Sequence, residues 1–247
     1  MRIAVVSLFP QMIREALGHG VIGRAQERGV FEVDCFDPRD YTADAHRTVD
    51  DRPYGGGPGM VLMALPVRSA IRAAAAALPP GSRRVYLGAD GRKFEQSMAR
   101  EACRWPGLVL VAGRYEGLDE RLIEHEIDEE WSIGDYVLSG GELPALVVID
   151  AIVRLMPGTL GSSESALQES FSDGLVDWPH YTRPQALDGH AVPAVLASGD
   201  HAAIHRWRLQ QALGRTWLRR PELLKLRGMS EEERELLEEF KIERARQ

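Results

Sequence analysis

The sequence has few cysteines and no long apolar run, and each shortage excludes a class of protein. Only Cys35 and Cys103 occur among the 247 residues, far apart in the chain, so neither a disulfide framework nor a zinc site is indicated. No apolar run approaches the roughly 20 residues that a membrane span needs. The apolar opening at residues 3–9 lacks a signal-peptide cleavage pattern. We expect a cytoplasmic protein with no membrane role.

Several motifs of catalysis are also missing. The chain has no G-x-G-x-x-G after a strand, no P-loop, no H-E-x-x-H and no G-x-S-x-G, which disfavours dinucleotide, triphosphatase, zinc-protease and serine-hydrolase chemistry. His201 and His205 lie one helical turn apart, but without a third ligand they predict no metal site. The acidic run at residues 119–130 lacks the pattern of a calcium loop and is interpreted as a solvated face. Any chemistry therefore needs an acid or base and a bound donor.

The charge balance hides a local contrast. A net charge of −7 argues against a nucleic-acid ligand, because Lys and Arg that neutralise phosphates supply most of such binding. However, residues 116–150 hold eleven carboxylates and one Arg, whereas residues 206–227 hold seven basic residues and the single acid Glu222. A basic surface is therefore expected inside an acidic protein.

The apolar pattern predicts an α/β fold with a parallel sheet. Runs of strand length occur at residues 3–8, 31–36, 84–87 and 108–112. Helical patterns occur between and after them, at residues 11–17, 66–78, 95–104 and 143–156. Strands that alternate with helices indicate βαβ units.

The texture of the chain changes after this α/β part. Residues 158–168 are rich in Gly, Ser and Ala, which is typical of a linker. Beyond it, residues 204–213 and 230–244 have helical patterns, and Ser230 and Glu233 have the spacing of a capping box. We expect a first domain at residues 1–160, a flexible linker at 161–175 and a small helical domain at 176–247.

Glycine loops and aromatic residues mark candidate binding sites. The loops lie at residues 54–59, 113–117 and 139–142. Each of these loops could be only a tight turn. The loop at 113–117, however, follows a predicted strand, and open α/β sheets bind ligands where parallel strands end. Trp207 and Trp217 alternate with arginines, a mixture that suits stacking on unpaired bases or, equally, the core of a small helical domain.

Five longer motifs resemble those of the bacterial tRNA (guanine-N1)-methyltransferases, the TrmD family of the SPOUT superfamily. They occur in the family's order and span nearly the whole chain: RTVDDRPYGGGPGM at 47–60, GRYEG at 113–117, DEEWSIGDYVLSGGELP at 128–144, PHYTRP at 179–184 and LGRTWLRRP at 213–221. Five such motifs in order are very hard to reach by chance. The resemblance implies an enzyme that moves the methyl group of S-adenosylmethionine to N1 of guanosine 37 in tRNA when position 36 is also guanosine.

The resemblance also implies a trefoil-knotted (SPOUT-type) parallel-sheet methyltransferase domain followed by a small helical domain. The knot loops would be residues 87–90, 113–116 and 132–141, with residues 133–138 offering backbone groups to the adenine and Glu116 near the ribose or the methionine end. The implied donor-binding residues are Tyr86, Leu87, Gly113, Glu116, Ser132, Ile133, Gly134, Asp135, Tyr136, Val137, Leu138, Gly140, Gly141 and Pro144.

The partners follow from the same resemblance. It implies an obligate homodimer in which each active site combines the knot of one chain with the helical domain of the other. The residues implied in tRNA binding are Gly55, Gly59, Arg206, Arg208, Arg215, Arg219 and Arg220. Magnesium is a further candidate cofactor, although no cluster of ligand residues in the sequence indicates where it would bind.

Two residues are implied in catalysis. Glu169 would take the N1 proton as general base, and Arg154 would stabilise the negative charge that spreads to O6. Family members usually carry Asp where this sequence has Glu169. Two alternatives remain open: a knotted methyltransferase for another RNA position, and a non-catalytic RNA-binding relative of which Glu169 is the signature.

Overall fold

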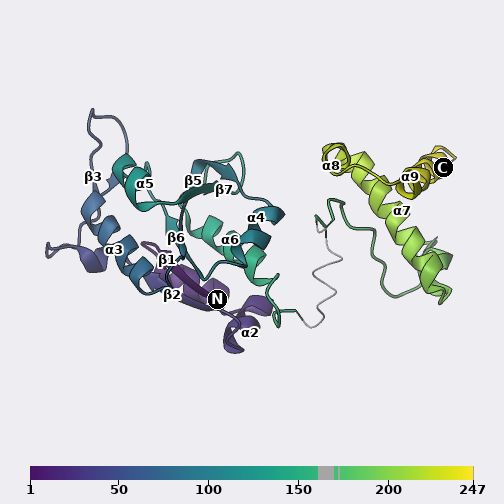
Figure 1. Ribbon diagram of the computed structural model, residues 1–247, viewed down its shortest axis with the longest axis horizontal. Helices are drawn as coiled ribbons and strands as arrows, with labels where there is room; N and C mark the ends of the chain where they lie inside the picture. The colour runs from purple at the N-terminus through teal and green to yellow at the C-terminus, as the bar shows by residue number, and fades with distance from the viewer. Residues whose placement is uncertain (161–169, 172, 247) are drawn as a thin grey trace. The chain divides into compact units, whose positions relative to one another are not determined.

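The computed structural model describes residues 1–160, 170–171 and 173–246. The chain divides into two compact units, Met1–Ser163 and Glu164–Gln247. The sheet and its helices belong to the first unit, and three further helices belong to the second (Figure 1). Most of the segment that the sequence analysis interprets as a linker lies outside the described residues. Within the described part of the chain, no helix is long and apolar enough to cross a membrane.

A parallel sheet of five strands forms the centre of the first unit. Its spatial order is β2-β1-β6-β5-β7, and every pair of neighbours is parallel. The strands are β1 (Arg2–Val6), β2 (Glu32–Phe36), β5 (Arg83–Lys93), β6 (Gly107–Ala112) and β7 (Glu129–Ser132). The four strands that the sequence predicts are present. The sequence pattern does not predict the fifth, β7, because two of its four residues are glutamates.

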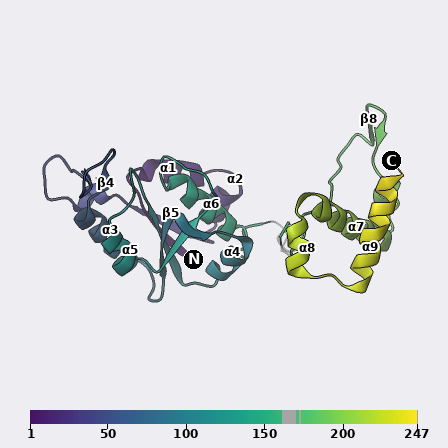
Figure 2. The same ribbon diagram turned by 90° about the horizontal axis from the view of Figure 1, so that it is seen from above.

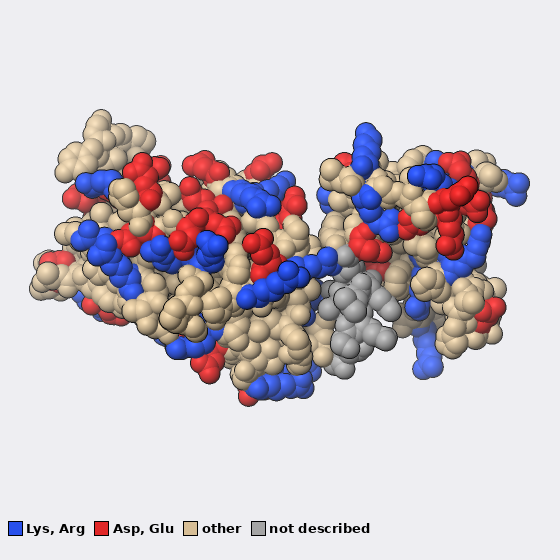
Figure 3. Space-filling view, viewed as in Figure 1, with Lys and Arg blue, Asp and Glu red and all other residues tan. Residues whose placement is uncertain are grey.

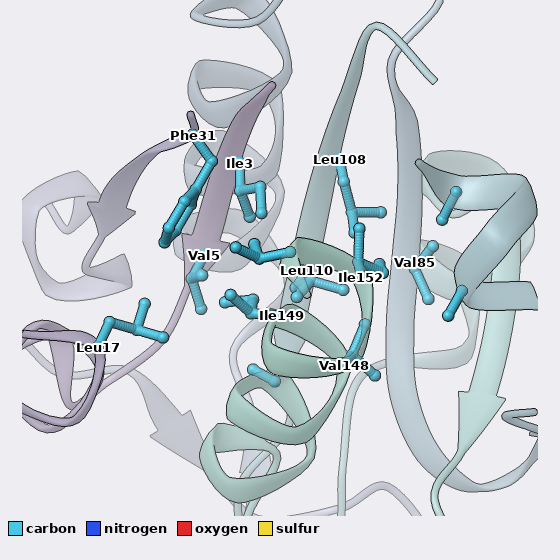
Figure 4. Close-up of a cluster of buried hydrophobic side chains, with 14 of the residues drawn as sticks. Ile3, Val5, Leu17, Phe31, Val85, Leu108, Leu110, Val148, Ile149 and Ile152 are labelled. Carbon is cyan, nitrogen blue, oxygen red and sulfur yellow. The ribbon is translucent and has the colours of Figure 1, made fainter. Parts of the chain in front are cut away.

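The strand residues alternate between two apolar layers, as expected of a sheet that is covered on both faces. Ile3 and Val5 of β1 pack in one layer, and Ala4 and Val6 pack in the other. Figure 4 shows the first layer, in which Val148, Ile149 and Ile152 lie against the strands. The helices of this layer are α1 (Pro10–Leu17), α2 (Gly20–Glu27), α4 (Gln96–Ala102) and α6 (Glu142–Val153).

The second layer is covered by α3 (Ala64–Ala76) and α5 (Glu120–Glu126), on the opposite side of the sheet (Figure 1). The interpretation of residues 119–130 as a solvated face holds for Glu120 and Glu124 of α5, which are exposed, but not for Glu126. Glu126 is buried at 6% exposure, where its carboxylate accepts hydrogen bonds from the Arg72 guanidinium and lies 3.7 Å from Arg84. This carboxylate is buried because cations compensate its lost hydration.

A glycine-rich loop projects from the first unit between two short strands. These are β3 (Asp50–Asp51) and β4 (Val61–Leu62), which pair antiparallel. A 3₁₀ turn at Pro38–Tyr41 precedes them. Gly55 has a φ of +87°, a conformation that favours glycine, and the neighbouring Tyr54 is wholly exposed.

The described residues of the second unit include three α-helices: α7 (His201–Arg219), α8 (Pro221–Arg227) and α9 (Glu231–Ala245). Figure 2 shows α7 beside both α8 and α9. The predicted capping box at Ser230 and Glu233 is present and begins α9. A two-stranded ribbon, β8 (Ala186–Leu187) and β9 (His190–Ala191), and a 3₁₀ turn at Ala194–Ala197 precede α7. The core consists of Leu175, Ala212, Leu213, Leu224, Leu236 and Leu237, and includes neither Trp207 nor Trp217.

Candidate active site

A cavity of about 270 Å³ opens at the carboxyl ends of β6 and β7, beside the middle of β5. Residues 86–90 of β5, the loop at 113–117 and residues 131–141 form it, and Pro144 in the first turn of α6 completes it. The segment 87–90, expected as a knot loop, is part of β5, whose register against β7 shifts between Leu87 and Arg92. Every residue that the sequence analysis assigns to the donor lines this cavity, except Asp135. The side chain of Asp135 is 93% exposed and lies 3.9 Å from Lys93. The cavity is at the sheet edge where open α/β proteins bind ligands.

Tyr86 holds two of these loops together. A Cβ atom on Gly88 or on Gly113 would come within 2.8 Å of the Tyr86 ring, so both loops approach the ring as only glycine permits. The ring itself is buried, and burial raises the pKa of the Tyr86 phenol. The Tyr86 ring fills the space between Gly88 and Gly113.

The third loop turns back on itself after β7. Gly134 has a φ of +152°, and its carbonyl accepts hydrogen bonds from the Ser132 hydroxyl at 3.2 Å and from the Tyr136 amide at 3.0 Å. The amides of Val137 and Leu138, which follow, donate to no other described residue. Two backbone donors therefore remain available to a ligand in the cavity.

The end of this loop is tied to β6 at very close range. The Gly141 amide donates to the Gly113 carbonyl at 2.8 Å, and an isolated bridge joins Arg114 to Gly140. A Cβ atom on Gly141 would lie 2.6 Å from Ala112 Cα and 2.9 Å from the Gly113 amide nitrogen. Since these are backbone atoms, no side-chain rotation can relieve the overlap.

Gly141→Val is therefore expected to abolish donor binding by pushing the third loop away from β6. Calorimetric titration with S-adenosylmethionine measures the effect, and circular dichroism reports whether the sheet persists. Gly18→Val is the matched control, because Gly18 also has a negative φ, and its added Cβ would meet carbonyl oxygens of α1 at an ordinary 3.5 Å. Donor binding by Gly141→Val equal to that of the parent would place the pocket elsewhere.

A buried carboxylate braces the same loops, and the sequence analysis missed it. Glu142 is 1% exposed, and its two oxygens accept hydrogen bonds from the Ser7 hydroxyl at 2.8 Å and from Arg114 Nε at 2.9 Å. Arg114 also donates to the Ser139 carbonyl at 3.0 Å and stacks over the Phe9 ring. Glu142 thus joins β1, β6 and the third loop at the start of α6. Its place beside two glycines in the motif SGGELP is the signal that could have found it.

The remaining charges of the cavity are negative. The charge of Arg114 is matched by Glu142, whereas the carboxylates of Asp90 and Glu116 form no ion pair with any described residue. Glu116 packs over Gly59, where a Cβ atom would overlap its side chain. A negative rim favours a ligand that carries positive charge and disfavours a polyphosphate.

Arg154 lies away from this cavity. It caps the carboxyl end of α6 and lines a separate cavity of about 450 Å³ with Asp150 and residues of α1 and α2. It lies ten positions after Pro144, which amounts to about 15 Å along the helix axis. The structure therefore does not bring Arg154 to the donor cavity of its own chain. Glu169 lies outside the described residues.

The arginines assigned to RNA differ in their surroundings. Arg206 forms an ion pair with Glu239 at 2.7 Å, and Arg220 pairs with Glu222. Arg208 stacks over the Trp178 ring at 5.0 Å. Arg215 and Arg219 line a third cavity, in the second unit. The glycines of the RNA set, Gly55 and Gly59, lie in the loop between β3 and β4.

Comparison with known proteins supplies the family. Residues 1–226 match the family model described as tRNA (Guanine-1)-methyltransferase TrmD. This chain belongs to that family. A tRNA (guanine-N(1)-)-methyltransferase of Methylococcus capsulatus is 62% identical over 243 residues, which cover 98% of this chain and 97% of that protein. Proteins of the same name from Proteus mirabilis and Cronobacter sakazakii are each 58% identical, over 98% and 100% of this chain and 97% and 96% of their own lengths.

Membership of the TrmD family gives the cavity an expected ligand, because a methyltransferase needs a methyl donor. The apolar wall formed by Leu87, Ile133 and Pro144 suits a flat adenine ring, and the unpaired carboxylates suit a sulfonium and an ammonium group. The residues present therefore fit S-adenosylmethionine. Among the described residues, no group of three or more His, Cys, Asp or Glu side chains is placed to hold an ion.

Proposed function

We propose that this protein transfers the methyl group of S-adenosylmethionine to N1 of guanosine 37 in tRNA, when position 36 is also guanosine. The observation that carries the proposal is the negatively charged, glycine-lined cavity at the carboxyl ends of β6 and β7, in a chain of the TrmD family. A tRNA-modifying enzyme of this kind works in the cytoplasm.

The cavity divides into parts that suit the parts of the donor. The backbone of residues 133–138 offers hydrogen bonds to the adenine, with free amides at Val137 and Leu138. Glu116 and Asp90 attract the positive methionine end. When bound, the donor supplies a reactive methyl group on a positively charged sulfur. The one basic side chain that lines the cavity, Arg114, is paired with Glu142. The cavity therefore favours this cation over a nucleoside phosphate.

The chain's own task is to make N1 of guanine a nucleophile. N1 bears a proton, so its lone pair becomes available only when a base removes that proton. We assign the base to Glu169. The negative charge then spreads to O6 of the guanine, where the Arg154 guanidinium stabilises it. N1 bonds to the methyl carbon as the bond between that carbon and sulfur breaks, with its electrons left on sulfur.

The proposed fold detail is a trefoil knot around the donor cavity. The support lies in the strand order, since β7 is at the edge of the sheet and β5 separates it from β6. The chain that leaves β7 nevertheless returns to the end of β6, where Gly141 bonds to Gly113. It must therefore cross β5. Such a crossing is the step by which a chain end can be threaded.

We also propose that two chains form an obligate homodimer with shared active sites. Helix α6 buries Val148, Ile149 and Ile152 against the sheet but leaves Leu143 and Val147, one turn apart, each 47% exposed. This apolar stripe suits burial against another surface. A second chain would also solve the placement of Arg154, which lies about 15 Å along α6 from Pro144 of its own donor cavity.

The tRNA partner is gripped, in this proposal, by the arginines of the second unit and by the loop with Gly55 and Gly59. Guanosine 37 must leave the stack of the anticodon loop to bring N1 beside the donor. We assign no step of the transfer to magnesium.

The decisive experiment follows a labelled methyl group into tRNA transcripts. We expect N1-methylguanosine in a transcript with guanosine at positions 36 and 37, and none when position 37 is adenosine. Replacement of guanosine 36 alone is expected to lower the rate strongly. Primer extension locates the product, because a methyl group on N1 blocks base pairing and stops the polymerase.

The outcomes separate the alternatives. Methylation that persists without guanosine 37 would mean a knotted methyltransferase for another RNA position. Binding of tRNA and donor without transfer to any transcript would mean a non-catalytic RNA-binding relative. Either result overturns the proposal.

A further inference from the structure

The second unit contains a cavity that neither the donor nor the methyl transfer uses. It lies between α7 and α9, which pack side by side (Figure 2), and residues 179–181 close one end. Its volume is about 310 Å³. We call it the α7/α9 cavity and describe it by Tyr181, Gln211, Arg215, Arg219, Phe240 and Arg244. One acid, Glu243, also lines it; this carboxylate accepts a hydrogen bond from the Gln210 amide at 3.5 Å and forms no ion pair with any described residue.

The arginines of this cavity lack acidic partners. Arg215, Arg219 and Arg244 form no ion pair with any described residue, whereas Arg206, Arg220 and Arg227 of the same unit each pair with a glutamate. Figure 3 shows how acidic and basic side chains are interspersed over the face of this unit that it presents. The Nε atom of Arg215 is buried and has no hydrogen-bond partner among the described residues. A buried donor of this kind is costly unless a ligand satisfies it.

Aromatic rings lie beside these charges. Phe240 is buried and packs so closely on α7 that a Cβ atom at Gly214 would overlap its ring. Tyr181 is 49% exposed, and its ring centroid lies 6.3 Å from that of Trp207. Trp207 therefore supports the Tyr181 ring while nearly half of the tyrosine surface stays open. An exposed ring that is held in place from behind is suited to stacking on a planar ligand.

We propose that the α7/α9 cavity binds one unpaired nucleotide of the tRNA substrate. The base stacks on the Tyr181 ring, and the Gln211 amide hydrogen-bonds to an edge of the base. Arg215, Arg219 and Arg244 bind the adjoining phosphates. The two arginines of α7 lie four residues apart and so face the same side of the helix. The choice of RNA as the occupant rests on the proposed function.

Only some of the residues of this site could be predicted from the sequence, because they come from separate parts of the chain. Arg215 and Arg219 belong to the motif LGRTWLRRP, whereas Arg244 comes from α9, 25 residues beyond Arg219 and inside a helix with seven glutamates. Tyr181 comes from the motif PHYTRP, 34 residues before Arg215. Only the packing of α7 against α9 brings the three arginines and the Tyr181 ring to the α7/α9 cavity.

The first test compares charge removal inside and outside the cavity. In the triple variant Arg215→Gln, Arg219→Gln and Arg244→Gln, tRNA affinity is expected to fall. The slope of log affinity against log salt is expected to flatten by about 0.7 for each phosphate that the variant no longer neutralises. Lys225→Gln, Arg234→Gln and Arg246→Gln remove the same charge from the same unit outside the cavity and are expected to change both far less. Equal effects in the two triple variants would overturn the proposal.

The second test asks whether a base occupies the cavity. Single abasic sites are placed in turn at the unpaired nucleotides of the tRNA, and affinity is measured with the parent protein, Tyr181→Phe and Tyr181→Leu. One abasic position is expected to weaken binding about 5- to 150-fold with the parent and with Tyr181→Phe, which keeps the ring. With Tyr181→Leu the same position is expected to cost little more, because the stacking partner is already gone.

Each result has a defined meaning. If no abasic position couples to Tyr181, no base stacks there and the proposal is wrong, whatever the methyl-transfer assay shows. If coupling is present but the parent transfers no methyl group, the cavity binds RNA and the proposed function is wrong. If the parent transfers methyl groups to tRNA and the cavity variants bind like the parent, the proposal is wrong and an acidic peptide becomes the next occupant to test.

Discussion

Glu169→Gln is expected to lower the single-turnover rate of methyl transfer by ~10²- to 10⁴-fold, the range usual for loss of a general base. The amide has the shape of the carboxylate but cannot accept the N1 proton. Affinity for S-adenosylmethionine is expected to stay unchanged, because the residues that line the donor cavity all lie between Tyr86 and Pro144. Quenched-flow transfer of labelled methyl groups and calorimetry measure the two quantities separately.

Glu169→Asp is the matched control. It keeps the carboxylate, has a similar intrinsic acidity and shortens the side chain by one methylene. It also restores the residue that the family usually carries, so substantial activity is expected to remain. A loss as large as that of the Gln variant would mean that reach, rather than proton transfer, dominates at this position.

The pH profile supplies an independent check on the same assignment. The single-turnover rate of the parent is expected to rise with pH as the base loses its proton, and this rising limb is expected to vanish in Glu169→Gln. A Gln variant that turns over like the parent would move the search for the base to Asp173, Asp177 or a water molecule.

The fold shows which signals in the sequence are sufficient. All six residues of β6 are buried, and the run GLVLVA is apolar throughout, so its pattern alone predicts a strand covered on both faces. Strand β7 has the sequence EEWS, in which only Trp131 and Ser132 are buried. Helix α2 contains two glycines in eight residues, and α8 has only seven residues. These elements depend on tertiary packing more than on local pattern.

The candidate site divides in the same way. Its loops are predictable because glycine motifs recur after strands whose carboxyl ends must share one edge of a parallel sheet. Glu142 is not predictable as a brace, because its partner Ser7 is 135 residues away and its partner Arg114 is 28 residues away. The three meet only because β6 lies beside β1. Asp135 is assigned to the donor by its place in the motif, yet its side chain is turned to solvent.

Two inactive variants are expected to restore activity when they are combined in one dimer. Arg154→Ala and Glu169→Gln are each expected to be inactive as homodimers. In a heterodimer of the two, one active site would contain both substitutions and the other would contain neither, provided that Arg154 and Glu169 reach each site from different chains. The heterodimer is therefore expected to have about half the activity of the parent.

Co-expression with two different affinity tags isolates the heterodimer, and single-turnover transfer to tRNA measures its activity. The matched control is a heterodimer of Glu169→Gln with the parent. There only one of the two sites contains the altered residue, so this heterodimer too is expected to keep one active site. If Arg154 and Glu169 instead act from the same chain, every site of the mixed dimer has one defect and no activity returns. That result would require Arg154 to span the roughly 15 Å of α6 between its position and Pro144 of its own donor cavity, which an extended arginine side chain is too short to do.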